Sequence, residues 1–287
     1  MRATIVVNPH AGKGRAPGIA KVISERLHRG GNRVTIINEN DLDNARLALK
    51  KSLAIFPPDR TIVVGGDGNV HWSIQELAGT PSALEVVPTG TGNDFARTHG
   101  FSRKSISRPT KRKIDLGHVT FKDQSRYFGQ ILSTGFDSAV NQRANNMKWL
   151  HGRLKYTMAT IAEIRSFAPI KYSLTIDGKR RNVEAIMVAV ANGDSYGGGM
   201  KLVPHANPSD GELDILILHT VSKWELIKVF PKIFSGRHIS HPAVETITAK
   251  RIIIDSNALV YADGEYVTQG KITVEIAPAA LALATSS

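Results

Sequence analysis

Two apolar runs in the first hundred residues each end in a glycine-rich turn that carries an aspartate. Residues 61–64 (TIVV) are followed by 65–68 (GGDG), and residues 84–88 (LEVVP) are followed by 90–94 (GTGND). Short apolar runs bounded by glycine are typical of buried strands. Glycine lets the backbone approach a phosphate, and the aspartates can hold a divalent cation directly or through water. The pair therefore predicts a nucleotide site built from loops, and with it phosphoryl transfer.

The same segment alternates between strand and helix patterns. Strands are predicted at 3–7, 33–37, 61–64 and 84–87. The helices between them present apolar stripes, namely Ile19, Val22, Ile23 and Leu27; then Leu42, Ala45 and Leu49 behind a cap at Asp41 or Asp43; then Ile74 and Leu77. This alternation predicts a parallel, Rossmann-like sheet covered by helices, with ligands at the carboxyl ends of its strands.

The pattern changes near residues 115–117, and strand patterns dominate from there on. Strand material is predicted at 121–132, 170–176, 183–191, 213–218, 247–254, 259–261 and 271–276, with a hairpin turn at 177–178. Helices are predicted at 149–167 and, interrupted by Pro231, at 222–234. We therefore expect an α/β domain at 1–117, an antiparallel β-rich sandwich at 118–275 and a tail at 276–287; whether this tail returns to the first domain stays open. A cleft is expected between the domains.

Composition excludes several classes of site. The chain of 287 residues contains no cysteine, which excludes disulfides, thiolate zinc sites and cysteine nucleophiles. No run approaches the roughly 20 apolar residues that span a bilayer. The apolar stretch at the start is too short for a signal peptide and is predicted to be the first strand. A cytoplasmic location is expected.

The charge balance favours an anionic partner. There are 37 basic and 25 acidic residues, a formal net charge of +12, and the densest basic segment is 103–113. Two interpretations of this segment stay open: a solvated loop, or contact with anionic headgroups at the inner membrane face, worth about 1 kcal/mol per nearby basic residue. Without interleaved aromatic residues or zinc-finger spacing, nucleic acid is not favoured.

Eight motifs follow one another along the chain. They are 8–14 (NPHAGKG), 65–68 (GGDG), 88–96 (PTGTGNDFA), 114–117 (IDLG), 133–137 (STGFD), 192–200 (NGDSYGGGM), 207–214 (NPSDGELD) and 263–265 (DGE). This ordered set resembles the diacylglycerol kinase catalytic family, which includes sphingosine kinases and bacterial soluble lipid kinases and is related to NAD kinases. The resemblance covers essentially the whole chain. It implies an ATP- and Mg²⁺-dependent lipid kinase, with a lipid substrate at the membrane surface as partner; a homodimer stays open.

The resemblance also implies roles for individual residues. The positions that match nucleotide-binding loops are Asn8, Pro9, Ala11, Gly12, Gly65, Gly66, Asp67, Gly68, Asn69, Thr91, Gly92 and Asn93. Asp67, Asp94 and Asp115 match aspartates that organise the catalytic magnesium. Asp210, with Asn207 and Glu212, matches a structural magnesium site. Glu265, in the motif with Asp263, matches the general base on the lipid hydroxyl. Many of these glycines and aspartates are also suited to turns and helix caps alone.

The chain departs from the family pattern directly after the first glycine turn. The family usually has threonine and, three residues later, glutamate where this chain has Asn69 and Trp72. Asparagine can still bond a phosphate, whereas a lost carboxylate can alter nucleotide binding. Trp72 is expected to pack in the core, with stacking on a base as the alternative. Two further functions therefore stay open: a weakly catalytic or non-catalytic nucleotide- or lipid-binding regulator, and a kinase of a soluble hydroxyl such as that of NAD.

Overall fold

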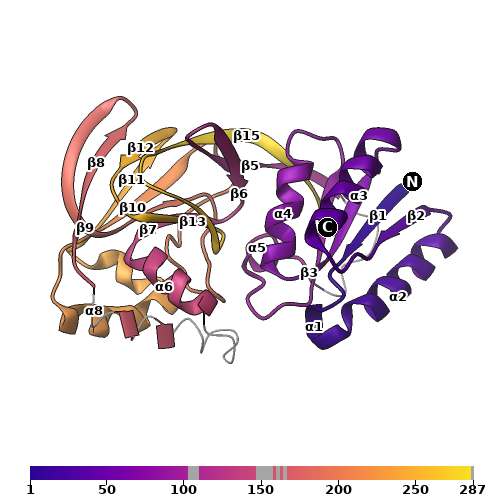
Figure 1. The fold of residues 1–287 in the computed structure, drawn as a ribbon, viewed down its shortest axis with the longest axis horizontal. Helices are drawn as coiled ribbons and strands as arrows, with labels where there is room; N and C mark the ends of the chain where they lie inside the picture. The colour runs from indigo at the N-terminus through magenta and orange to yellow at the C-terminus, as the bar shows by residue number, and fades with distance from the viewer. Residues whose placement is uncertain (103–109, 147–157, 160–161, 164–166, 286–287) are drawn as a thin grey trace. The chain divides into compact units, whose positions relative to one another are not determined.

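The computed structural model of the chain describes residues 1–102, 110–146, 158–159, 162–163 and 167–285. The chain divides into two compact units (Figure 1). Unit 1 consists of Met1–Ile114 and Ala279–Ser287, and unit 2 consists of Asp115–Pro278. Two strands, β5 (Thr110–Phe121) and β15 (Ile272–Thr285), contribute residues to both units.

Unit 1 alternates strands and helices. Its further elements are β1 (Arg2–Val7), α1 (Ala11–Gly14), α2 (Ala16–Arg29), β2 (Arg33–Ile37), α3 (Leu42–Ile55), β3 (Arg60–Gly65), α4 (Asp67–Leu77), β4 (Ala83–Pro88) and α5 (Asp94–Thr98). The strands lie in the order β2-β1-β3-β4, followed by the end of β15, and all of these pairs are parallel. The predicted parallel sheet is confirmed.

Helices cover both faces of this sheet. Ile5 of β1 and Ile62 of β3 pack with Ile23 of α2 in one apolar cluster. On the other face, the hydroxyls of Thr4 in β1 and Ser52 in α3 are 2.9 Å apart. The predicted apolar stripes of the helices are confirmed only in part. Two of the residues assigned to them, Val22 and Leu42, are exposed, to 63% and 50%.

Unit 2 is β-rich, and its strands pair antiparallel. Its further elements are β6 (Gln124–Phe128), β7 (Ile131–Gly135), α6 (Phe136–Asn146), β8 (Ile170–Ile176), β9 (Lys179–Ala191), β10 (Leu213–His219), α8 (Lys223–Val229), the 3₁₀ helices η1 (Phe230–Ser235) and η2 (Arg237–Ser240), β11 (Val244–Ala249), β12 (Arg251–Asp255), β13 (Leu259–Ala262) and β14 (Glu265–Gln269). The long strand β9 pairs with β8 through its first half, and with β7 and β10 through its second half.

The second half of β9, residues 185–191, is buried on both faces. Val188 and Val190 point into a core shared with β7, β8, β10, β12 and β13. Met187 and Ala189 point into a second apolar cluster, which is covered by α6, α8 and the 3₁₀ helices; Figure 1 shows α6 and α8 on the same side of unit 2. Burial on both faces explains why this half of the strand is entirely apolar. The expected α/β domain followed by a β sandwich is confirmed.

Several predicted elements differ from the structure. The strand predicted at 247–254 is wrong, because the chain turns at Lys250 and forms β11 and β12 on either side. The Asp177 carboxylate holds this turn by accepting the N–H groups of Lys250 at 3.2 Å and Arg251 at 2.9 Å. The strand material at 121–132 is the end of β5, β6 and the start of β7. The interruption predicted at Pro231 in the helix 222–234 is confirmed, because α8 ends at Val229 and the 3₁₀ helix η1, which contains Pro231, follows. Most of the helix predicted at 149–167 lies outside the described residues.

Candidate active site

The two glycine turns of unit 1 meet backbone to backbone. They follow β3 and β4, which are neighbours in register, with Gly65 opposite Pro88. A Cβ on Gly90 would lie 2.8 Å from Cα of Gly66, and one on Gly66 would lie 3.3 Å from Cα of Gly90. A side chain at Gly90 would therefore displace Gly66, and one at Gly66 would be tight. Glycine lets the two turns approach each other closely here, a contact that was not predicted.

Asp67 joins the turns. Its carboxylate accepts the backbone N–H of Asn93 at 2.6 Å and of Asp94 at 2.8 Å, at the start of α5. A Cβ on Gly92 would lie 2.5 Å from Oδ2 of Asp67. Burial, followed by the negative charge of Asp94, raises the pKa of Asp67 to about 6. A cation between the two carboxylates would relieve this repulsion.

Asp94 is buried and pairs with Arg97, whose Nη2 also donates to the carbonyl of Gly92 at 2.7 Å. Arg97 was not predicted as a site residue, although its spacing of three from Asp94 on a helix was a usable signal. Asn93 has a φ of 53° and bonds both backbone groups of Gly90 through its side chain. The second turn is therefore held from within and by Asp67.

The loop after β1 lies beside the first turn. Asn8 donates from Nδ2 to Oδ1 of Asn69 at 3.1 Å and accepts the N–H of His10 at 2.9 Å. Gly12 has a φ of 61°, and a Cβ there would touch Cβ of Thr89 at 3.4 Å. Of the other predicted nucleotide residues, Gly68 and Thr91 are exposed, while Pro9 and Ala11 are half-buried.

Thr89 lies between the turns and was missed. Its backbone N–H donates to the Gly65 carbonyl at 2.9 Å, and its buried hydroxyl has no hydrogen-bond partner among the described residues. A buried hydroxyl without a partner costs about 1–3 kcal/mol, which makes it a candidate donor to a ligand. No feature of the sequence distinguishes it from Thr91.

In unit 2, Asp115 is tied to the predicted metal loop. Asp115 is buried in β5; its N–H donates to the Pro208 carbonyl at 2.8 Å, and its Oδ2 accepts the N–H of Gly211 at 2.8 Å. Asp210 is exposed and accepts the N–H of Glu212 at 3.1 Å. The other candidate ligands of this loop, Asn207 and Glu212, are exposed as well.

Asp263 and Glu265 belong to one turn with different environments. Asp263 has a φ of 50°, and its carboxylate accepts the N–H groups of Gly129, Gln130 and Ile131 at 2.8 to 3.1 Å. Glu265 is exposed at the start of β14. The pKa of Tyr261 is raised, first by burial, then by the neighbouring Tyr266, and third by the charge of Glu265. Asp263 therefore holds the turn, whereas Glu265 is exposed to solvent.

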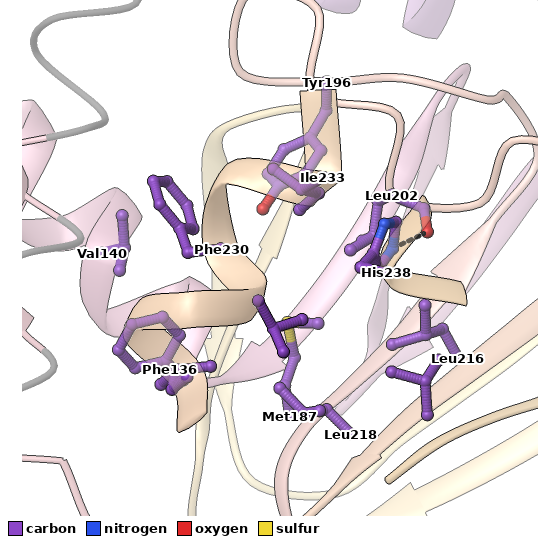
Figure 2. A pocket seen from close by; sticks show the side chains of 13 residues that line it. Phe136, Val140, Met187, Tyr196, Leu202, Leu216, Leu218, Phe230, Ile233 and His238 are labelled. Atoms are coloured by element: carbon purple, nitrogen blue, oxygen red, sulfur yellow. Dashed lines mark hydrogen bonds between the residues drawn. The ribbon is translucent and has the colours of Figure 1, made fainter. Parts of the chain in front are cut away.

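An apolar pocket lies within unit 2 (Figure 2). It has a volume of about 60 Å³, and its lining includes Phe136, Val140, Met187, Leu218 and Phe230. Figure 2 shows these side chains around one space between the sheet and the helices of the second apolar cluster.

Two family models match the chain. The diacylglycerol kinase catalytic domain matches residues 2–119, and the YegS C-terminal NAD kinase beta sandwich-like domain matches residues 130–285. A diacylglycerol kinase of Mycobacterium tuberculosis is 37% identical over 291 residues, covering 98% of this chain and 94% of that protein. The chain belongs to the diacylglycerol kinase family. The resemblance seen in the eight motifs is confirmed, and the family consists of phosphotransferases with an alcohol acceptor.

Two further similar proteins are more distant than this one. A diacylglycerol kinase of Bacillus subtilis is 27% identical and covers 92% of this chain and 90% of that protein. The crystal structure of a putative diacylglycerol kinase from Bacillus anthracis superposes with a TM-score of 0.77 at 22% identity, over 99% of this chain and 95% of that one. This structural likeness shows the shared fold.

The resemblance implies a divalent cation, and the candidate ligands for it fall into two sets. Asp67 and Asp94 lie in unit 1; Asp115, Asn207, Asp210 and Glu212 lie in unit 2. Within the described part of the chain, no group of three or more His, Asp or Glu side chains could hold a metal by itself. Mg²⁺ is commonly held by one or two carboxylates together with substrate phosphates, and the Asp67–Asp94 pair fits that description.

None of the helices that the structure describes has the length and apolar character needed to cross a membrane.

Proposed function

We propose that this chain is an ATP- and Mg²⁺-dependent lipid kinase that transfers the γ-phosphate to the hydroxyl of a diacylglycerol-like or other long-chain lipid. The observation that carries the proposal is Asp67, whose carboxylate holds the second glycine turn against the first, where Gly66 and Gly90 make close backbone contact. Bare backbone beside a helix N-terminus and two carboxylates suits polyphosphate with its metal.

On the nucleotide side, the residues bind and orient. The turns at Gly66 and Gly90 present backbone to the phosphates, and Asn69 and Thr89 add side-chain donors. Asp67 and Asp94 hold Mg²⁺, and the bound metal offsets negative charge on the phosphate oxygens. Arg97 keeps Asp94 in place through its ion pair.

On the acceptor side, Glu265 accepts the proton of the lipid hydroxyl as the hydroxyl oxygen bonds to the γ-phosphorus. The bond from that phosphorus to the β–γ bridging oxygen breaks at the same time, and ADP leaves. Asp263 holds the turn that precedes Glu265. Asp210 and its loop would bind the structural cation. The apolar pocket of unit 2 supports a lipid acceptor over a soluble one, since its size and lining suit a few methylene groups of an acyl chain.

A lipid acceptor also implies contact with the membrane surface. The net charge of +12 and the basic segment 103–113 support peripheral contact with anionic headgroups at the inner membrane face. Of that segment, residues 103–109 lie outside the described residues. The proposal holds equally for a monomer and a homodimer.

The test is a transfer assay with three acceptors: dispersed diacylglycerol, a long-chain monohydric alcohol and NAD. Purified protein is incubated with Mg²⁺ and ATP labelled at the γ-phosphate. We expect label in an organic-soluble product, its loss in Asp67→Ala, and its retention in Asp43→Ala, an exposed aspartate of α3. Label in NAD alone would identify a soluble acceptor. ATP binding without any transfer would identify a regulator.

A further inference from the structure

Asn192 lies directly after β9 and is almost completely buried, with 1% of its surface exposed. Its side-chain nitrogen donates to two backbone carbonyls, that of Asp115 at 3.0 Å and that of Gly129 at 3.1 Å. Two carbonyl acceptors determine which end of the amide is the nitrogen. One side chain thus bridges two segments that are far apart in the sequence.

The first segment leads to the predicted metal loop. Asp115, whose carbonyl accepts from Asn192, holds residues 208–211 through its own N–H and carboxylate. Asp210 lies in that loop, and its carboxylate accepts the backbone N–H of Glu212. A displacement of the Asp115 backbone therefore moves the loop that carries Asp210.

The second segment leads to the predicted base. Gly129 begins the turn 129–131, whose three N–H groups all donate to the Asp263 carboxylate. The N–H of Asp263 donates back to the Ile131 carbonyl at 2.9 Å. Glu265 follows two residues after Asp263, so the position of this turn determines the position of Glu265.

The backbone beside Asn192 strengthens the second connection. The N–H groups of Asn192 and Gly193 both donate to the Gln130 carbonyl, at 2.8 and 3.0 Å. A Cβ on Gly193 would lie 2.2 Å from Oε1 of Gln130, so the two segments pack without space between them. The backbone at Asn192 therefore packs tightly against Gln130, and its side chain bonds to Asp115 and Gly129.

We infer that Asn192 is a positioning residue that holds the Asp210 loop and the Glu265 turn in one fixed arrangement within unit 2. Its catalytic consequence rests on the proposed function. Removal of the amide frees the carbonyls of Asp115 and Gly129 and lets the two segments move independently. Misplacement of a catalytic group by about 1 Å costs up to about 10²-fold in rate.

The test uses Asn192→Ala and the milder Asn192→Ser in the full chain, with Asn182→Ala, at an exposed residue of β9, as matched control. Amide hydrogen exchange is measured at Gly129, Gln130, Ile131 and Gly211, with the core amides of Val188 and Leu216 as reference. We expect faster exchange in both segments, an unchanged core, and wild-type behaviour in the control.

The kinetic readout separates positioning from a loss of fold. We expect kcat to fall by about 10²-fold while KM for ATP stays unchanged, because the nucleotide residues lie in unit 1. Faster exchange in one segment only, or an unchanged kcat, would overturn the inference. If wild-type protein transfers no label to any lipid, the proposed function fails, and the exchange rates alone then decide whether Asn192 couples the two segments.

Discussion

The side chain of Asn69 accepts a hydrogen bond from Nδ2 of Asn8 at 3.1 Å, across the join between the first loop and α4. A Cβ on Gly65 would lie within 2.9 Å of three atoms of Asn69, including Nδ2. Asn69, which stands where the family usually has threonine, is therefore held by Asn8 and packed against Gly65, beside the two glycine turns. A fixed amide beside bare backbone is a usable phosphate donor.

This arrangement predicts that Asn69→Thr retains lipid kinase activity within about threefold, because a hydroxyl can also donate to phosphate. Asn69→Ala should raise KM for ATP by about tenfold, since a hydrogen bond to a charged group is worth about 1.5–3 kcal/mol. Steady-state kinetics with varied ATP measures both changes. An Asn69→Ala variant with unchanged KM would remove Asn69 from the nucleotide site.

Trp72, the second departure from the family pattern, is a core residue. It is 7% exposed in α4, as expected for a core residue, so stacking on a base is not supported by its burial. Restoring the family glutamate there would bury a charge without a partner and destabilise the fold. Asn69→Thr is for this reason the informative restoration, and a large gain in its activity would indicate a decayed kinase.

The close contact of Gly66 and Gly90 predicts that Gly90→Ala forces the two turns apart. We expect the affinity for Mg²⁺·ATP to fall by more than tenfold, because the new methyl group would lie 2.8 Å from Cα of Gly66. Calorimetric titration measures it. The matched control is Gly18→Ala in α2, where a Cβ meets nothing within 4 Å. Equal affinities in the two variants would contradict the predicted cradle.

The raised pKa of Asp67, about 6 against an ordinary 3.8, predicts a pH-dependent stability. Folded protein holds the proton more tightly than unfolded protein, so the contribution of Asp67 is lost as pH rises from about 4 to about 6. The unfolding free energy of Asp67→Asn minus that of wild type should therefore increase over this range, by about 1–3 kcal/mol. Denaturant unfolding between pH 4 and 7.5 measures it.

Magnesium provides the control for that experiment. A cation binds the charged carboxylate, so saturating Mg²⁺ should flatten the pH dependence of the wild-type protein and leave Asp67→Asn unchanged. A slope that is the same with and without Mg²⁺ would show that Asp67 does not hold the cation.

The buried ion pair between Arg60 in β3 and Glu85 in β4 predicts a stability effect remote from the site. The two side chains lie 3.0 Å apart, and burial raises the pKa of Glu85 to about 7 despite its partner. Arg60→Met alone should cost about 3–5 kcal/mol, since it leaves Glu85 without a partner, whereas Arg60→Met with Glu85→Leu should be near neutral. Urea unfolding measures both; equal losses in the single and double variants would contradict the pairing.

The sequence was most informative where strand ends and glycine coincide. The parallel sheet and the meeting of 65–68 with 90–94 follow from buried strands that must be neighbours for their turns to share an edge. The bonds of Asp67 to the next turn were not predictable, because backbone donors carry no residue signature. The role of Asn192 was not predictable from its motif, because this role depends on segments more than sixty residues away.

The second half of the chain was harder to interpret for a related reason. The segment 247–254 has strand-forming residues on both sides of Lys250 and Arg251 and was predicted as one strand. Hydrogen bonds from the N–H groups of these two residues to the Asp177 carboxylate divide it into two. Antiparallel pairing between distant segments decides such breaks. The apolar cluster under α6 and α8 likewise draws on residues from 131 to 244 that no local pattern connects.

The most direct measurement is transfer of labelled phosphate from Mg²⁺·ATP to diacylglycerol in mixed micelles by wild type, Asp67→Asn and Glu265→Gln, each checked for ATP binding. The account predicts an organic-soluble labelled product from wild type, weakened ATP binding and no product from Asp67→Asn, and normal ATP binding with kcat lowered by about 10²–10⁴-fold in Glu265→Gln. Wild-type activity in both variants, or folded wild-type protein that binds ATP and labels no lipid, would contradict it.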